Sequence, residues 1–118
     1  TADGRVDMDL AIPAEMGGSG DGANPEQLFA AGYAACFHSA LQSVARQAKK
    51  KLGDSSVGAR VSIGKAGEGF GLAVTLEVVI PDLPQDEAQQ LADAAHQVCP
   101  YSNATRGNIR VDVQVVDD

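Results

Sequence analysis

Two cysteines are the side chains of this sequence with the most chemical potential. Cys36 lies in a long apolar run, and Cys99 follows 63 residues later, directly before Pro100. A thiolate can act as a nucleophile or a metal ligand, whereas a buried thiol is more often an inert small side chain. From these residues alone, the reactive and the inert interpretations both stay open.

Two histidines offer rival interpretations of the thiols. Cys36 with His38, and His96 with Cys99, could together form a Cys2His2 zinc site. His96 and Cys99 share a helix face, but residues two apart, like Cys36 and His38, point about 200° apart on a helix. We therefore expect no metal. A Cys-His hydrolase pair is weaker still, because the sequence offers no recognisable third group or oxyanion loop.

A long predicted helix, residues 24–52, carries Cys36 near its middle. Asn24 is suited to the N-cap, Pro25 to the first helical position, and Gln27 to a capping box. Gly53 is placed to end the helix as a C′ glycine, after a cationic run that suits the negative end of the helix dipole.

The first half of this helix, Leu28 to Phe37, is apolar nearly all round. Such a segment is expected to be buried on every side. Its alanines and Gly32 permit another backbone to come close. A protein of this size covers such a helix most easily by dimerising, so we expect a homodimer with this helix in the interface.

The other elements follow from hydrophobic periodicity. We expect a strand at Arg5–Ile12, a glycine-rich loop at 16–23, a hairpin of strands 57–63 and 70–80, a helix at 85–98, a polar turn or short helix at 101–107, and a last strand at 109–115. The loop lacks the Lys-Ser/Thr pair of a phosphate loop, so a hinge or close-packed connection is the better interpretation. The order predicts a single α+β domain over residues 1–118, with antiparallel pairing.

Composition narrows the class of protein. The chain has 118 residues, a net charge of −7 and nine Lys and Arg residues. No basic stripe or interleaved aromatics appear, which argues against nucleic acid as a partner. No apolar run reaches the ~20 residues that a membrane span needs, and no signal-peptide pattern precedes the first strand. Two cysteines do not make a disulfide scaffold, so we expect a cytoplasmic protein.

Two blocks of the sequence resemble a known family. Asn24-Pro25-Glu26-Gln27-Leu28-Phe29-Ala30-Ala31-Gly32-Tyr33-Ala34-Ala35-Cys36-Phe37 is similar to the first signature of the organic hydroperoxide resistance proteins, the Ohr branch of the OsmC/Ohr superfamily. Val98-Cys99-Pro100-Tyr101-Ser102-Asn103-Ala104-Thr105-Arg106-Gly107-Asn108 is similar to the second. The resemblance covers essentially the whole chain, and it implies an intertwined homodimer with sheets wrapped around central helices and active sites at the interface.

The resemblance also implies roles for individual residues. In the family, the first cysteine is peroxidatic and the second is resolving, which maps onto Cys36 and Cys99. The glutamate that orients a catalytic arginine maps onto Glu26. That arginine lies on a loop upstream of the strand expected at 5–12, and the chain begins too late to contain it.

Three arginines within the chain are alternatives to the upstream one. Arg5 falls in the expected strand and matches another family position, and Arg60 lies in the hairpin. Arg106 lies in the second signature, where a structural role is the better interpretation. No arginine of this chain is therefore expected to be catalytic, and the chain as given is expected to fold but to be a poor peroxidase.

The function implied by the resemblance is a thiol-dependent peroxidase. It would reduce alkyl and fatty-acyl hydroperoxides to alcohols through a Cys36 sulfenic acid and a Cys36–Cys99 disulfide, with no cofactor. A lipoylated protein or another dithiol is the implied reductant. The alternative is a non-catalytic OsmC-like ligand-binding or structural dimer in which both thiols are inert.

Overall fold

The computed structural model describes residues 1–117; position 118, the last residue of the expected single domain, lies outside the described residues. The elements are a 3-10 turn at Ala14–Met16, α1 at Pro25–Gln47, β1 at Ser56–Ala66, β2 at Gly69–Val79, α2 at Gln85–Val98, α3 at Pro100–Thr105 and β3 at Arg110–Val115. The hairpin, the second helix, the short helix after it and the last strand are thus confirmed. None of the described helices is both long and apolar enough to cross a membrane.

The strands form one sheet in the order β1-β2-β3. β1 and β2 pair antiparallel from Ser56 opposite Val79 to Ala66 opposite Gly69. β3 pairs parallel with β2, however, so the expectation of antiparallel pairing throughout was wrong. The physical reason is the connection: α2 and α3 lie between β2 and β3, and such a crossover returns the chain to the end of the sheet from which β2 began.

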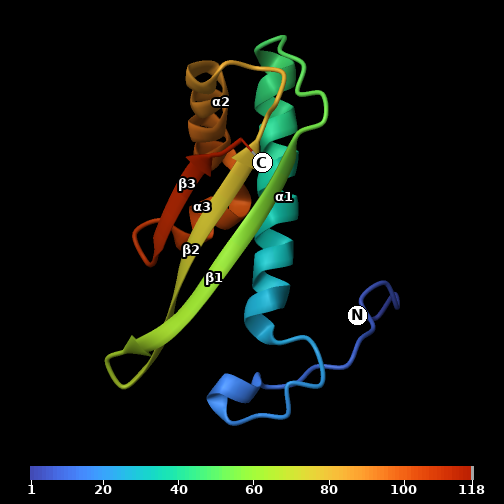
Figure 1. Ribbon diagram of the computed structural model, residues 1–118, viewed down its shortest axis with the longest axis vertical. Coiled ribbons are helices and arrows are strands. Elements are labelled where there is room, and N and C mark those ends of the chain that lie inside the picture. Colours follow the sequence, from blue (N-terminus) through green and yellow to red (C-terminus); the bar gives the residue numbers. More distant parts are fainter. Residues whose placement is uncertain (118) are drawn as a thin grey trace.

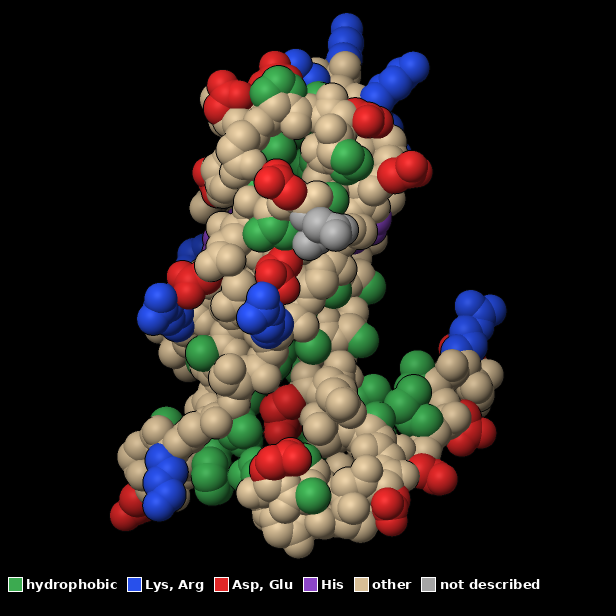
Figure 2. Space-filling model, in the orientation of Figure 1, with side chains coloured by type: hydrophobic (Ala, Val, Ile, Leu, Met, Phe, Trp, Pro, Cys, Tyr) green, Lys and Arg blue, Asp and Glu red, His purple; other side chains and the backbone are tan. Residues whose placement is uncertain are grey.

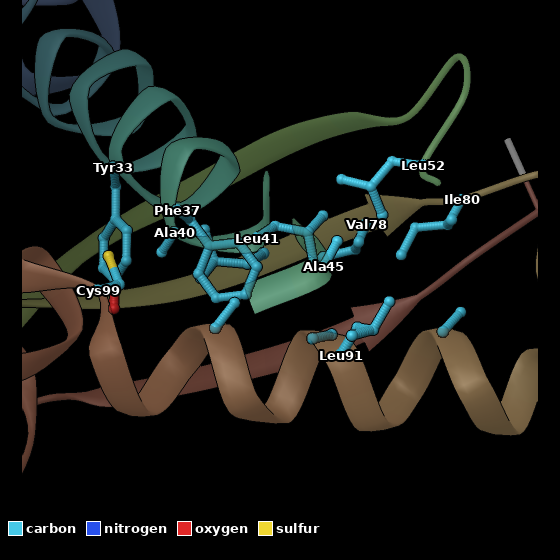
Figure 3. Packing of buried hydrophobic residues seen from close by; sticks show 14 of the residues in the cluster. Tyr33, Phe37, Ala40, Leu41, Ala45, Leu52, Val78, Ile80, Leu91 and Cys99 are labelled. Carbon is cyan, nitrogen blue, oxygen red and sulfur yellow. The ribbon is translucent and has the colours of Figure 1, made fainter. Parts of the chain in front are cut away.

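The helices pack on one face of the sheet and enclose the hydrophobic core (Figure 1). Alternate residues of β2 point into this core, and helices α1 and α2 supply most of the remaining side chains. Figure 3 shows this packing, with α1 and α2 contributing side chains from the two sides of the cluster. The fully buried large members are Tyr33, Phe37, Leu41, Leu76, Val74, Val78 and Cys99.

The start of α1 matches the sequence expectation. The Asn24 side chain accepts a hydrogen bond from the Gln27 backbone N–H at 2.8 Å, and the Gln27 side chain accepts one from the Asn24 N–H at 3.0 Å. This capping box satisfies two backbone donors, and Pro25 occupies the first turn, where its missing N–H costs nothing.

The end of α1 differs from the expectation. The helix stops at Gln47, five residues before the end that Gly53 predicted. Lys49 takes the left-handed conformation, with φ at 58°, and the Lys50 N–H bonds the Ala45 carbonyl at 2.8 Å. This is a Schellman motif, which usually carries glycine at the position of Lys49. Gly53 has a positive φ as well, but it lies in the loop toward β1.

The N-terminal segment does not form the expected strand at Arg5–Ile12. It makes a single bridge, Leu10 to Ala23, and its apolar side chains are left in solvent. The exposed side chains are Val6, Met8, Leu10 and Ile12, and they gather on the arm that extends from the body of the molecule (Figure 2). A strand needs a neighbour along its length to pair its backbone, and within residues 1–117 this segment has only the single bridge at Leu10.

The first half of α1 is also less covered than expected. Tyr33 and Phe37 are 0 % exposed, but Ala31 and Ala35 are exposed. Burial on every side is therefore not achieved within a single chain. The exposed apolar side of α1 and the unpaired N-terminal arm are both surfaces that another chain could cover.

Candidate active site

The structure brings the two cysteines together. The Sγ atoms of Cys36 and Cys99 lie 3.6 Å apart, with the Cys99 thiol donating to the Cys36 sulfur. Both are free thiols in this structure. A disulfide bond is ~2.05 Å long, so about 1.5 Å of approach separates this contact from a covalent bond. Small side-chain and backbone adjustments can supply such a movement.

The position of Cys99 follows from the proline after it. The residue before a proline is biased away from the helical region, and Cys99 has extended backbone angles, φ −66° and ψ 125°. It therefore ends α2, donating its N–H to Ala95 at 2.9 Å, and its carbonyl accepts the Asn103 N–H of α3 at 3.0 Å. Cys99 is 0 % exposed, so this break between two helices presents its thiol to the interior, against α1.

The environment of Cys36 favours the protonated thiol. Burial raises its pKa, and the hydrogen bond and charge of Cys99 raise it further. The opposing effect comes from the backbone N–H of Tyr101, whose hydrogen bond to the Cys36 sulfur lowers the pKa. No cation from residues 1–117 contributes to this balance. A reactive thiolate at this position would need a positive charge from elsewhere.

Three aromatic rings of α1 and α3 pack against one another. Tyr101 stacks on Phe29 with ring centroids 6.2 Å apart, and its ring lies 5.7 Å from that of Tyr33. Gly32 makes room for this arrangement: a Cβ there would lie 3.1 Å from the Tyr101 hydroxyl. These rings form an aromatic cluster between α1 and α3.

A buried polar network lies next to the thiols. The Tyr33 hydroxyl is 2.8 Å from the Ser102 hydroxyl and 3.2 Å from that of Thr105. The Ser102 hydroxyl is 2.7 Å from His96 Nδ1. Burial lowers the pKa of His96, and the nearby charge of Arg106 lowers it further, against the opposing effect of Asp93. This network joins α1, α2 and α3.

The histidines are engaged away from the sulfurs. His38 Nε2 lies 2.9 Å from the Ser55 hydroxyl, and His96 bonds Ser102 as described above. Among residues 1–117, no three His, Cys, Asp or Glu side chains gather in a group that could hold a metal ion.

Similarity to known proteins identifies the family to which this chain belongs. Residues 18–114 match the family OsmC, described as OsmC-like protein. The chain belongs to the OsmC family. Within that family it resembles the organic hydroperoxide resistance proteins: it is 55% identical over 113 residues to the organic hydroperoxide resistance protein of Xanthomonas axonopodis pv. citri, covering 94% of this chain and 80% of that one. The Bacillus subtilis protein OhrB is 46% identical over 115 residues, 96% of this chain and 84% of the relative.

Solved structures agree with this assignment. This OsmC protein superposes on an organic hydroperoxide resistance protein of Legionella pneumophila with a TM-score of 0.91 and 52% identity, covering 96% of this chain and 83% of that one. It superposes on a Vibrio cholerae relative, which has captopril bound in one of its active sites, with a TM-score of 0.90 and 54% identity, covering 96% and 78%. The expected OsmC/Ohr-like α+β fold is confirmed.

Glu26 is the candidate residue that the structure does not bring to the cysteines. It lies in the first turn of α1, ten positions before Cys36, and ten residues of α-helix span about 15 Å. Glu26 instead lines a groove of about 320 Å³ with Met16, Val61 and Ile63 among its neighbours. Within one OsmC chain, Glu26 therefore cannot contact the thiol of its own Cys36.

The three candidate arginines of this OsmC chain have other partners. Arg60 forms a two-point ion pair with Glu77, at 2.8 and 3.0 Å, and Arg5 lies 4.0 Å from Asp3. Arg106 donates to the His96 carbonyl at 2.7 Å, where it satisfies a backbone acceptor near the end of α2.

Sequence reasoning did not single out the Tyr33–Ser102–His96 network. A weak signal was present, because a tyrosine inside an otherwise apolar helix needs a partner for its hydroxyl. The identity of that partner depends on how α3 packs on α1, which no local pattern reveals.

Proposed function

We propose that this OsmC-family chain is a thiol-dependent peroxidase that reduces organic hydroperoxides to alcohols. The observation that carries the proposal is the 3.6 Å contact between Cys36 and Cys99, which lie 63 residues apart in the sequence. The names of its relatives, which are organic hydroperoxide resistance proteins, support the substrate class.

In the first step, the Cys36 thiolate attacks the distal oxygen of the hydroperoxide. An S–O bond forms, the O–O bond breaks, and the alkoxide takes a proton and leaves as the alcohol. The peroxide is reduced, and Cys36 is oxidised to a sulfenic acid. Cys36 is assigned this role because it is the more accessible of the two thiols, whereas Cys99 is 0 % exposed.

In the second step, the Cys99 sulfur attacks the Cys36 sulfur. An S–S bond forms, the S–O bond breaks, and the hydroxide leaves as water with the proton of the Cys99 thiol. The 3.6 Å separation places Cys99 to intercept the sulfenic acid before a second hydroperoxide oxidises it further.

A dithiol would complete the cycle by exchange. Its two thiols are oxidised to a disulfide, while Cys36 and Cys99 return to their reduced state. A lipoylated protein is our proposed physiological dithiol, on the strength of the family resemblance. Two free thiols also fit a reducing compartment, so we infer a cytoplasmic location.

Aromatic side chains favour an organic substrate. The stacked rings of Phe29 and Tyr101 would offer apolar contact to an alkyl chain, which gains free energy when it leaves water. Hydrogen peroxide has no such group and is strongly hydrated. We therefore expect alkyl and fatty-acyl hydroperoxides to react faster than hydrogen peroxide.

We further propose that the working unit is a homodimer. The chain exposes 7592 Å², whereas a folded monomer of its mass exposes about 6,000 Å². Its radius of gyration is 15.9 Å, whereas a chain of this length packs to about 13.5 Å. A second copy would cover the apolar N-terminal arm and the exposed side of α1.

The proposed dimer would also give Glu26 a functional role. Glu26 is about 15 Å along α1 from the Cys36 of its own chain, too far for contact. We propose that Glu26 orients the arginine that the family carries upstream of the segment at residues 5–12, at an active site formed at the interface, as the family resemblance implies. That guanidinium would supply the charge that residues 1–117 of one chain do not bring to Cys36.

One observation favours a second candidate, a non-catalytic dimer with inert thiols. Burial raises the pKa of Cys36, which is the behaviour of a structural cysteine. Turnover decides between the two. With a small dithiol as reductant, the peroxidase consumes tert-butyl or fatty-acyl hydroperoxide repeatedly and faster than hydrogen peroxide. If the protein consumes hydroperoxide no faster than the dithiol does alone, the non-catalytic dimer is the remaining candidate.

A further inference from the structure

We propose that a hydrogen-bonded chain from Tyr33 through Ser102 to His96 positions Cys99 for its attack on oxidised Cys36. Tyr33, Ser102 and His96 act as positioning residues, since they bond one another rather than the sulfurs. The inference rests on the proposed function for its role in turnover. Its geometric part concerns only how closely the two thiols are held.

The network joins the elements that carry the two thiols. Tyr33 lies on α1, three residues before Cys36, and Ser102 lies on α3, three residues after Cys99. His96 lies on α2, three residues before Cys99. Each member is thus about one helical turn from a sulfur. Bonds of 2.8 and 2.7 Å through one shared hydroxyl fix the α2–α3 break against α1.

Burial makes these bonds costly to break. Tyr33 and Ser102 are 0 % exposed and Thr105 is 5 % exposed, so water cannot replace a lost partner. Within residues 1–117, every buried side-chain nitrogen and oxygen has a hydrogen-bond partner. A fully satisfied buried network specifies one arrangement of its elements, because any displacement leaves a polar group unpaired.

Packing alone would hold the thiols less closely. Figure 3 shows Cys99 beside the Tyr33 ring, at the end of α2 where the apolar cluster ends. The sulfurs must close from 3.6 Å to ~2.05 Å, so displacements below an ångström alter how often they meet in line. In the step affected, the S–S bond forms, the S–O bond of the sulfenic acid breaks, and water leaves.

The test uses two variants that delete single hydroxyls, Tyr33→Phe and Ser102→Ala, in the full chain. Rapid mixing with an organic hydroperoxide separates sulfenic acid formation from disulfide formation. We expect the rate of the first step to be unchanged. The second step should slow about tenfold, because losing the hydroxyl should displace the Cys99 sulfur by about 1 Å or less. Excess hydroperoxide should then leave more Cys36 as sulfinic acid. Tyr33→Phe keeps the ring and decides the matter if Ser102→Ala does not fold.

Ser55→Ala is the matched control. It removes a serine hydroxyl bonded to the other histidine, His38, at 2.9 Å, and it should leave both steps as they are. Disulfide formation at the parent rate in the folded variants would overturn the proposal. Equal slowing of both steps would overturn it too, because a general loosening of the fold does not distinguish Cys99 from Cys36.

A second measurement separates this inference from the proposed function. Equilibration with a glutathione redox buffer reports how readily the Cys36–Cys99 disulfide closes, without any peroxide. We expect the equilibrium constant to fall about tenfold in Tyr33→Phe, which is about 30 mV for a two-electron couple. If the parent chain does not react with hydroperoxides but Tyr33→Phe still lowers the equilibrium constant, the peroxidase proposal is refuted and the positioning role stands. An unchanged constant would refute the positioning role.

Discussion

Cys36 and Cys99 meet at 3.6 Å although 63 residues separate them. The contact depends on three features: the apolar packing of α1 on α2, the break that Pro100 imposes between α2 and α3, and the buried network around Ser102. The thiols are therefore placed by the tertiary structure, and the following experiments ask what that placement does.

Replacing the cysteines one at a time should separate their roles. Cys36→Ser is expected to abolish hydroperoxide consumption, since it removes the group that attacks oxygen. Cys99→Ser should react once per chain and leave an oxidised Cys36 open to over-oxidation or to external thiols. Mass spectrometry of each variant after excess hydroperoxide checks this. Normal turnover by Cys36→Ser would reverse the assignment.

The alkylation rate of Cys36 should depend on pH in a way that reflects its burial. Burial raises its pKa above the usual value for a thiol, so the rate should keep rising above pH ~8.5. The Cys99→Ser chain isolates Cys36 for this measurement, and free cysteine serves as the reference. A plateau below that pH would mean that a cation stabilises the Cys36 thiolate. Residues 1–117 of one chain do not supply that cation.

His96 should make the protein sensitive to acid. Its pKa is lowered, chiefly by burial, so the unfolded chain takes up a proton at a higher pH than the folded one. The free energy of unfolding should therefore fall as pH drops below ~6.5, toward the lowered pKa. Urea unfolding at several pH values should show a weaker pH dependence in His96→Gln. His38→Gln controls for the loss of an imidazole, and an equal effect of both variants would contradict the prediction.

The exposed side of α1 should control dimerisation. Ala35→Arg places a charged side chain on the exposed face of α1, where we expect the second copy, and should yield monomers at micromolar concentration in sedimentation experiments. Ala94→Arg makes the same change on the exposed face of α2 and should stay dimeric. A stable monomer of the parent chain, or equal dissociation of both variants, would contradict the proposed interface.

Most of the fold could be predicted from the sequence because its signals are local. The capping box at Asn24 and Gln27 fixed where α1 begins, and the period-two pattern of β1 and β2 fixed the hairpin. The end of α1 could not be predicted, because Lys49 takes a left-handed conformation that usually needs glycine. The parallel pairing of β3 depends on where the α2–α3 crossover ends, which is a tertiary property.

The candidate site also has features that the sequence could predict and features that it could not. The pairing of Cys36 with Cys99 was accessible only through the family resemblance, since spacing along the chain does not reveal a 3.6 Å contact. The arm at residues 5–12 has the alternation of a strand, but within residues 1–117 it makes only the single bridge from Leu10 to Ala23. Glu26 likewise has no contact with the thiols of its own chain. Both of these features depend on surfaces that one chain does not complete.

The central claim is that Cys36 and Cys99 form one redox pair that an organic hydroperoxide oxidises. The most direct measurement is to count thiols and determine the intact mass after one equivalent of hydroperoxide per chain. We predict the loss of both thiols and of the mass of two hydrogens, with Cys36 linked to Cys99 in the same chain. Two thiols still titrating after the hydroperoxide is added would contradict the account.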